Sequence, residues 1–323
     1  MSELLDILRK EIRMQGPISL ARYMEMCLSH PKHGYYGNRD PLGVDGDFIT
    51  APEISQVFGE LIGLWAAVVW QQIGEPKKIR LVELGPGRGT LMVDALRAAN
   101  MLPSFFDSIE LHLVESSKSL RKIQNKRLAD YLPVWHDDDT TLPDGPMIVI
   151  ANEFFDALPI RQFERGKKGW HEKLVGLQED GSLAYLLSPL MNVNELIAKS
   201  YRHVEPGTIV ETCPAGINIL SRIAEAIGCY GGGALIIDYG HDGSVVGNTF
   251  QAVKGHKYCS PLELPGDTDL TSHVNFGQLI EAATSLTTNV YGPIKQSVFL
   301  QSLGARERAE ELKMNANEAE REK

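Results

Sequence analysis

An acidic residue and three glycines at alternate positions form the stretch best suited to hold a ligand. They are Glu83, Gly85, Gly87 and Gly89, within Leu81-Val-Glu-Leu-Gly-Pro-Gly-Arg-Gly-Thr-Leu91. Glycine lets the backbone approach a ligand closely, and a helix start presents N–H groups without intrahelical partners. The dinucleotide fingerprint G-x-G-x-x-G is absent, because Thr90 stands where its third glycine is required. The spacing therefore disfavours an NAD oxidoreductase, while a plain strand-to-helix turn remains an alternative.

A second polar group follows the apolar run Met147 to Ala151. The chain continues Asn152-Glu153-Phe154-Phe155-Asp156, and polar groups beside a buried strand cost about 1 to 3 kcal/mol each when they are left unsatisfied. Either these side chains cap a helix and pair locally, or they serve a substrate. If the substrate is a guanidinium, carboxylates must hold the cation and orient its nitrogen. Asn152, Glu153 and Asp156 are the candidate catalytic residues.

Acids also follow two other apolar runs. Glu115 ends the run Ile109 to Val114, where a carboxylate can accept both hydroxyls of a ribose. Asp137 and Asp138 end the run Pro133 to His136, where an acid can contact an adenine amine. For these two residues a solvated turn is an equally good interpretation.

Alternating strand and helix patterns would bring these residues together. The pattern predicts strands at Ile79 to Leu84, Ile109 to Val114, Pro133 to His136 and Met147 to Ala151, with helices at Thr90 to Asn100 and Ser117 to Leu128. Such alternation indicates an α/β fold with a mostly parallel sheet, right-handed crossovers and helices on both faces. Ligands of such sheets collect at the carboxyl ends of the strands, where all the residues named above lie.

The N-terminal part is expected to cover this site. Helical spacing at Leu4 to Ile12 and from Ser19 to Leu28 precedes an irregular segment, His30 to Ala51, which we interpret as a cover over the cofactor. Thr50-Ala51-Pro52-Glu53 then reads as a capping box opening a long helix. Capping alone explains these residue types, and their place beside the cover adds Thr50 and Pro52 to the candidates.

The remaining chain is predicted to form an inserted β-meander and then complete the sheet. Short strand-like runs lie at Arg161 to Glu164, Trp170 to Gln178 and Ser182 to Ser188, and helical pieces at Val193 to Tyr201, Phe276 to Ala283 and Gln296 to Leu303. Strands are expected at Ala234 to Tyr239 and Thr288 to Gly292, and the charged tail Ala305 to Lys323 reads as a solvated or frayed helix. The meander is either a substrate platform or a contact between copies in a homodimer.

Five motifs, taken in order, resemble the MidA family of S-adenosylmethionine-dependent methyltransferases. They are Tyr35-Tyr36, Asp47-Phe48-Ile49-Thr50-Ala51-Pro52-Glu53, Val82-Glu83-Leu84-Gly85-Pro86-Gly87-Arg88-Gly89, Asn152-Glu153-Phe154-Phe155-Asp156-Ala157-Leu158-Pro159 and Glu211-Thr212-Cys213-Pro214. The resemblance runs from about Ile18 to about Gly304. It implies a class I methyltransferase fold, S-adenosyl-L-methionine as cofactor, and an arginine of a respiratory NADH dehydrogenase subunit as acceptor. This sequence departs from the family in showing no strand character after Ala305, where members close the sheet with a hairpin.

Taken together, the predicted cofactor-binding residues are Thr50, Pro52, Glu83, Gly85, Gly87, Gly89, Glu115, Asp137, Asp138 and Asn152. The predicted units are 1–75 (helices and cover), 76–160 with 205–304 (cofactor-binding domain), 161–204 (β-rich substrate subdomain) and 305–323 (tail). The leading hypothesis is a protein arginine methyltransferase. The alternative is an assembly factor that binds S-adenosylmethionine or its client without turnover.

Composition limits the partners. The chain has 323 residues and a net charge of -10, which argues against nucleic acid as partner. Its 4 cysteines have no C-x-x-C spacing, and no histidine pair has metal-ligand spacing, so reduced thiols and no metal are expected. No apolar run is long enough to span a bilayer, and the first residues are acidic where a targeting peptide would be basic. The predicted location is the cytoplasm.

Overall fold

A five-stranded parallel sheet forms the centre of the computed structural model, which describes residues 3–38, 50–286 and 288–315. The strands lie in the order β10 (Gly232–Ile237), β5 (Met147–Asn152), β2 (Ile79–Leu84), β3 (Ile109–Val114) and β4 (Val134–His136). The predicted α/β fold with a mostly parallel sheet is confirmed. Strand order reverses at β2, which lies between β3 and β5, and a ligand crevice is expected at such a switch point.

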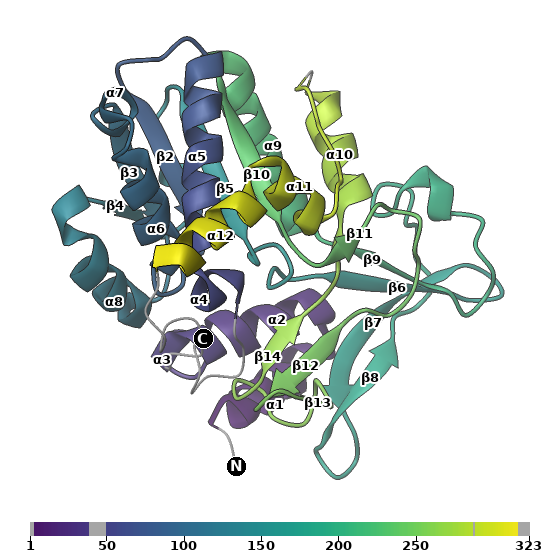
Figure 1. Cartoon of the computed structure of the whole chain (residues 1–323). Coiled ribbons are helices and arrows are strands. Elements are labelled where there is room, and N and C mark those ends of the chain that lie inside the picture. Colours follow the sequence, from purple (N-terminus) through teal and green to yellow (C-terminus); the bar gives the residue numbers. More distant parts are fainter. Residues whose placement is uncertain (1–2, 39–49, 287, 316–323) are drawn as a thin grey trace.

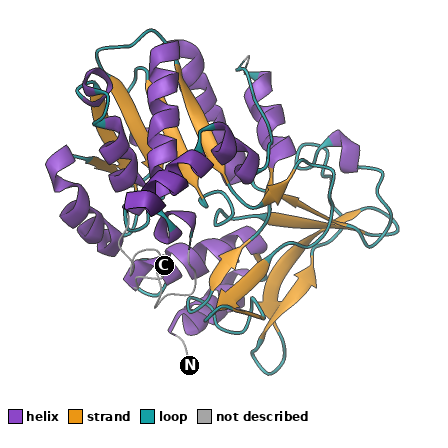
Figure 2. Ribbon diagram, viewed as in Figure 1, coloured by secondary structure: helices purple, strands orange, loops and turns teal. Residues whose placement is uncertain are grey.

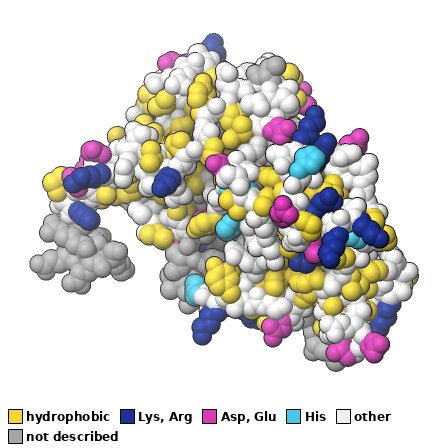
Figure 3. All heavy atoms as spheres, turned by 90° about the vertical axis from the view of Figure 1, so that its right-hand side faces the viewer, with side chains coloured by type: hydrophobic (Ala, Val, Ile, Leu, Met, Phe, Trp, Pro, Cys, Tyr) yellow, Lys and Arg dark blue, Asp and Glu magenta, His cyan; other side chains and the backbone are white. Residues whose placement is uncertain are grey.

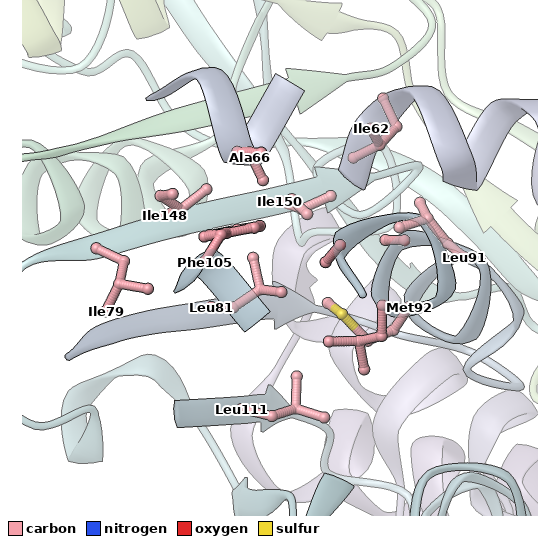
Figure 4. Packing of buried hydrophobic residues seen from close by; sticks show 14 of the residues in the cluster. Ile62, Ala66, Ile79, Leu81, Leu91, Met92, Phe105, Leu111, Ile148 and Ile150 are labelled. Carbon is pink, nitrogen blue, oxygen red and sulfur yellow. The ribbon is translucent and has the colours of Figure 1, made fainter. Parts of the chain in front are cut away.

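Helices cover both faces of this sheet (Figures 1 and 2). Helices α5 (Gln56–Gln72) and α6 (Thr90–Ala99) pack on one face, and α9 (Pro214–Tyr230) and α10 (Phe276–Ser285) pack on the other. Side chains alternate between the faces: Leu81 packs with the first pair of helices, and its neighbour Val82 packs with the second. Figure 4 shows the first of these cores, where side chains of β2, β5 and α6 meet. Burial on both faces fixes the strand register, and therefore the place where each strand ends.

Close packing between α5 and α6 holds the start of α6. A Cβ added at Gly63 of α5 would lie 2.4 Å from the carbonyl oxygen of Ala95 in α6, and one added at Gly59 would lie 2.8 Å from that of Leu91. Only glycine permits this approach, so the two helices behave as one rigid support for the turn that precedes α6.

A second layer, of strands that are antiparallel except for the parallel pair β11 (Gly240–His241) and β15 (Val274–Asn275), lies below the parallel sheet in Figure 1. One sheet has the order β1 (Ile18–Ser19), β7 (Trp170–Leu177), β6 (Arg161–Arg165), β9 (Ile209–Thr212), with β8 (Leu183–Leu187) pairing with β7. Three more strands pair as β13 (Lys257–Cys259), β12 (Gln251–Lys254), β14 (Asp269–Thr271), and two as β11 with β15. The predicted β-meander is present as β6 to β8.

The N-terminal helices belong to this second layer. Residues of α1 (Glu3–Gln15) and α2 (Leu20–Ser29) share a core with Val175 of β7, Ala252 of β12 and Leu270 of β14. Half of the predicted cover, residues 39–49, lies outside the described residues. Its described part contains the short helix α3 (Tyr35–Asn38).

The predicted capping box at Thr50 is wrong. Thr50 precedes the short helix α4 (Ala51–Ile54) without a side-chain cap, and Ser55 instead caps α5 by accepting from the Val57 N–H at 3.2 Å. The Glu53 carboxylate does not reach back, because it accepts from the Thr90 hydroxyl at the start of α6. The capping pattern of Thr50 and Glu53 does not form because Glu53 binds Thr90, which lies 37 residues further along the chain.

Two further local predictions are wrong. The predicted helix Val193 to Tyr201 is reduced to the 3-10 turn η3 (Lys199–Tyr201), and the predicted strand Thr288 to Gly292 has no regular structure. The other short elements are α7 (Pro103–Phe106), α8 (Lys118–Leu128), η1 (Ala129–Tyr131), η2 (Asp139–Thr141) and α11 (Gln296–Ser302).

The start of the charged tail is a helix, as one of the two expectations had it, and none of its residues with described burial is buried. It forms α12 (Ala305–Asn315), which crosses α5 in Figure 1. Arg308 of α12 donates to Glu60 of α5 at 2.8 Å, and Arg97 of α6 donates to the same carboxylate at 2.9 Å. Of the two ion pairs of Glu60, the one with Arg308 holds the otherwise exposed helix α12 against α5.

The division into units stays a prediction, and packing crosses two of its boundaries. Helix α5 lies within 1–75 but packs on the parallel sheet, and β9 lies within 205–304 but pairs with β6. Among the described residues, no helix has the length and apolar character to cross a bilayer, and no three His, Cys, Asp or Glu side chains cluster as metal ligands would. Figure 3 shows basic and acidic side chains interspersed with apolar ones on one face.

Candidate functional site

A cavity of about 670 Å³ lies at the carboxyl end of the parallel sheet. The predicted residues that line it are Thr50, Pro52, Glu83, Gly85, Gly87, Glu115, Asp137, Asp138, Asn152, Glu153 and Asp156. Gly89 is the predicted site residue that does not line it. The lining also includes residues that sequence reasoning missed, among them Tyr36, Tyr239, Tyr258 and Asp269.

The three glycines shape the turn between β2 and α6. Their φ angles are +63° at Gly85, +53° at Gly87 and +78° at Gly89, in the left-handed region that favours glycine. A Cβ at Gly85 would lie 2.8 Å from the ring of Phe154, and one at Gly89 would lie 3.1 Å from Leu128. Gly85 and Gly87 therefore bring the backbone to the cavity, whereas Gly89 permits the turn and the packing of α8 behind it.

Glu83 is a buried carboxyl group with an unused acceptor. Its side chain lies near the end of β2, is 3% exposed, and its Oε2 atom has no hydrogen-bond partner among the described residues. Burial, and then the nearby charge of Glu115, raise the pKa of Glu83 to about 8. A buried acceptor without a donor costs free energy, so a ligand that brings a donor, above all a cationic one, fits this position.

Glu115 is held in one orientation at the end of β3. Its Oε1 accepts from the Ser117 N–H at 2.7 Å, and its Oε2 accepts from Gln124 at 3.2 Å. The same Gln124 amide donates to the carbonyl of Gly87 at 2.8 Å, while its oxygen accepts from Trp135 at 2.9 Å. Gln124 thus ties the acid to the glycine turn, a role that a lone glutamine in a helix does not signal.

Asp137 and Asp138 line the cavity but already have partners. Asp137 accepts from Arg121 at 2.5 Å, and Asp138 caps η2 by accepting from the Thr140 N–H at 2.9 Å. Both side chains are exposed. Their contact with an adenine amine stays a prediction, and the alternative of a solvated turn describes what they do here.

Asn152, the last residue of β5, lies at one corner of the cavity with Glu153 and Asp156 of the loop that follows. The Oδ1 atom of Asn152 is buried without a partner among the described residues. Glu153 has a φ of +49°, a conformation that costs a non-glycine residue on the order of 1 kcal/mol. Strain of this kind persists where the surroundings impose it, and it turns the Glu153 side chain into the cavity.

Four carboxyl groups from three segments meet near this corner: Glu153 and Asp156 of the loop, Asp238 after β10, and Asp269 of β14. Burial first, and then Asp269, raise the pKa of Glu153 to about 7. Burial, followed by Asp238, Asp269 and Glu153, raises the pKa of Asp156 well above its ordinary value. Asp269 also accepts from the Tyr36 hydroxyl at 3.1 Å.

The corner is short of positive charge. Within the described part of the chain, Glu153, Asp156 and Asp238 form no ion pair with Arg, Lys or His. Buried acids without a cation lower their charge by taking up protons, which is what the raised pKa values express. The arrangement is suited to a cationic substrate group.

Comparison with known proteins agrees with this geometry. A family model described as "Putative S-adenosyl-L-methionine-dependent methyltransferase" matches residues 61–294. The chain is 40% identical over 332 residues to protein arginine methyltransferase NDUFAF7 of Xenopus laevis, covering 93% of this chain and 74% of that protein. It is 38% identical over 341 residues to the Homo sapiens protein of the same name, covering 98% and 76%.

A solved structure supports the cofactor. The chain superimposes on a Burkholderia thailandensis protein bound to S-adenosyl-homocysteine with a TM-score of 0.84 and 27% identity, covering 95% of this chain and 82% of that one.

The prediction of a cytoplasmic location is wrong. The Xenopus laevis, human and Mus musculus relatives are all named as mitochondrial proteins.

Proposed function

Because the chain belongs to the MidA family of S-adenosyl-L-methionine-dependent methyltransferases, we propose that it methylates an arginine side chain of a protein client. The observation that carries the arginine assignment is the acidic corner formed by Glu153, Asp156 and Asp269 in the cofactor cavity. The curated relatives, whose names include protein arginine methyltransferase, support the same acceptor.

The residues around the glycine turn fit the cofactor. The orphaned Oε2 of Glu83 would accept from the ammonium group of its methionine part. Glu115, already oriented by Ser117 and Gln124, would accept from the ribose hydroxyls. The positive φ angles of Gly85 and Gly87 leave room for the ligand beside the backbone. Bound S-adenosyl-L-methionine supplies an electrophilic methyl carbon attached to a positively charged sulfur.

The acceptor would be held by carboxylates on the other side of the cavity. A guanidinium is planar and pairs with carboxylates through two parallel N–H bonds, so Glu153 and Asp156 can fix the plane of its nitrogens. Pairing with this cation lowers the raised pKa values of both acids and keeps them ionised. Asp269 adds charge to the same corner and is itself held by Tyr36.

Proton removal completes the reaction. Transfer of the methyl group to an acceptor nitrogen would leave the bonding electron pair on the cofactor sulfur and give that nitrogen one proton in excess. The nitrogen then loses a proton, which Glu153 accepts and passes to water. Most of the barrier is lowered by positioning and by the exclusion of water, because the methyl group must be approached in line with the bond that breaks.

For the identity of the client, the family resemblance implies a subunit of respiratory complex I, and we propose the same class here.

The homodimer stays a prediction. Strand β8 and the segment after it expose Leu186, Leu187 and Leu190 at 38%, 49% and 54%, which is where a second copy would be expected to bind. Sedimentation of the purified chain tests this.

The test of the proposed function is transfer of labelled methyl groups. Arginine peptides, the same peptides with arginine replaced by lysine, and wild-type or E153Q protein would be incubated with methyl-labelled cofactor. Label on arginine with wild-type protein, lost with the lysine peptide and reduced with E153Q, supports the proposal. Tight cofactor binding with no transfer to any arginine peptide or client would favour an assembly factor without turnover.

A further inference from the structure

Asp238 lies directly behind the acidic corner rather than in it. It follows β10, and its side chain does not line the cavity that Glu153 and Asp156 line. A carboxyl group in this place cannot touch the acceptor, yet its contacts run to the segment that does.

Three backbone N–H groups converge on the Asp238 carboxylate. Its Oδ2 atom accepts from Phe155 at 3.0 Å and from Asp156 at 3.2 Å, and its Oδ1 atom accepts from Tyr239 at 2.8 Å. Both oxygens of the side chain are therefore committed to the backbone.

These bonds continue the strand ladder where it would otherwise stop. Strands β5 and β10 pair in parallel up to Asn152 and Ile237, and the Glu153 N–H donates to the Ile237 carbonyl at 2.9 Å. The positive φ of Glu153 then turns the chain away from the sheet. The next amides would lose their partners at a partly buried site, and the Asp238 side chain accepts from them in place of a strand.

The loop is also fixed from its other side. The carbonyl of Asp156 accepts from the Ser272 N–H at 3.0 Å, and the carbonyl of Tyr239 accepts from the Val274 N–H at 2.8 Å. Thus the Asp238 side chain connects the end of β10 to the loop carrying the acids, and backbone bonds connect both of these to Ser272 and Val274, which follow β14.

We propose that Asp238 is a positioning residue for methyl transfer, which acts by holding the loop that carries Glu153 and Asp156 in its strained conformation. This inference rests on the proposed function for the nature of the acceptor. The hydrogen bonds by which Asp238 holds the loop are independent of that function. A displacement of about 1 Å at a reacting group can cost on the order of 100-fold in rate, so a loose loop would slow the reaction without emptying the cofactor site.

The variant D238N tests this with little change in shape. Asparagine can accept from only one of the two sides, because its amide group would face N–H donors on the other. We expect kcat with an arginine peptide to fall by about tenfold or more, with cofactor affinity and the thermal midpoint nearly unchanged. D242N is the matched control, since exposed Asp242 likewise accepts from a backbone N–H, that of Ser244 at 3.0 Å, and does not line the cavity.

A double-mutant cycle separates positioning from a general structural role. If Asp238 acts through the corner acids, D238N has much less effect on kcat in an E153Q background than in wild type. An equal loss in both backgrounds, a kcat like that of D242N, or a parallel loss of cofactor affinity would overturn the proposal.

Amide hydrogen exchange gives a test that needs no substrate. The Phe155, Asp156 and Tyr239 amides are expected to exchange slowly in the wild-type chain, and to exchange faster in D238N. Fast exchange of all three in wild type would refute the contacts on which the proposal depends. Absence of any arginine methylation would instead refute the proposed function, and the exchange result would still decide whether Asp238 holds the loop.

Discussion

Glu83 offers the sharpest quantitative prediction, because removal of its charge should stabilise the ligand-free chain while it weakens cofactor binding. The carboxyl group is 3% exposed, its Oε2 has no partner among the described residues, and its pKa is raised to about 8. In E83Q a neutral amide of nearly the same shape takes its place.

The magnitude follows from the difference between folded and unfolded pKa values. The ordinary value is 4.5, so the folded state binds a proton more tightly than the unfolded state between about pH 4.5 and about pH 8. Stability of the wild-type chain therefore falls as the pH rises through this window. At pH 7 the burial of Glu83 makes the free energy of unfolding of the wild-type chain lower than at a pH below 4.5 by on the order of 3 kcal/mol. This follows from about 1.4 kcal/mol for each pH unit above the ordinary pKa. The E83Q variant would still bury a polar amide, so we expect a gain of about 1 to 3 kcal/mol.

The assay compares urea unfolding of wild type and E83Q at pH 5, 7 and 8, with calorimetric titration of S-adenosyl-L-methionine. We expect the stability difference to grow from pH 5 to pH 8, and the cofactor affinity of E83Q to fall by about tenfold or more, since a charge-assisted hydrogen bond is lost. E60Q is the matched control. Burial raises the pKa of Glu60, but hydrogen bonds from Arg308 and Arg97 outweigh this and lower it, so E60Q should destabilise the chain. Equal destabilisation by both variants, or unchanged cofactor affinity in E83Q, would refute the reasoning.

Four further predictions concern the same site and its support. Because the pKa of Glu153 is about 7 and its ionised form is required, kcat/KM for an arginine peptide should fall as the pH drops from about 8 to about 6. In E153Q, kcat/KM should be low throughout with a weaker pH dependence. A pH profile of E153Q equal to that of wild type would contradict the role of this acid. Glu115→Ala should weaken cofactor binding by about 10- to 100-fold in calorimetry, because two hydroxyls lose a charged acceptor. Gly85→Ala should abolish the thermal shift produced by cofactor, since the new Cβ would lie 2.8 Å from Phe154 at a φ of +63°, whereas Gly228→Ala, with nothing within 4 Å, should leave it intact. Ile150→Ala should lower the free energy of urea unfolding by about 2 to 5 kcal/mol, because Ile150 is fully buried between β2 and the α5–α6 pair, and a smaller loss would mean that the core collapses around the cavity.

The central sheet could be predicted from sequence because its information is local. Leu81 and Val82 are adjacent and both buried, on opposite faces, which only a strand with helices on both sides allows. Once strand ends are known, parallel pairing brings Glu83, Glu115 and Asn152 to one edge without knowledge of any contact.

What could not be predicted depends on partners distant in the sequence. Asp269 reaches the corner through β14, more than 100 residues after Glu153, and nothing near it in sequence indicates this. Asp238 stands at the end of the strand expected at Ala234 to Tyr239, but its bonds to the amides of Phe155 and Asp156 could not be predicted. The capping box failed because Glu53 binds Thr90, and the strand expected at Thr288 failed because no neighbouring strand pairs with it in the described chain. The cytoplasmic location was inferred from the acidity of the first residues, and the relatives named mitochondrial overturn it.

The proposed methyl transfer depends most on where the acceptor lies relative to the cofactor. A crystal structure of the chain with S-adenosyl-homocysteine and an arginine peptide would test this directly. We expect the nucleoside to lie at Gly85 and Glu115, with the guanidinium between Glu153 and Asp156 and one of its nitrogens facing the sulfur. A peptide arginine that lies outside this corner, or a nucleoside placed away from the glycine turn, would contradict the account.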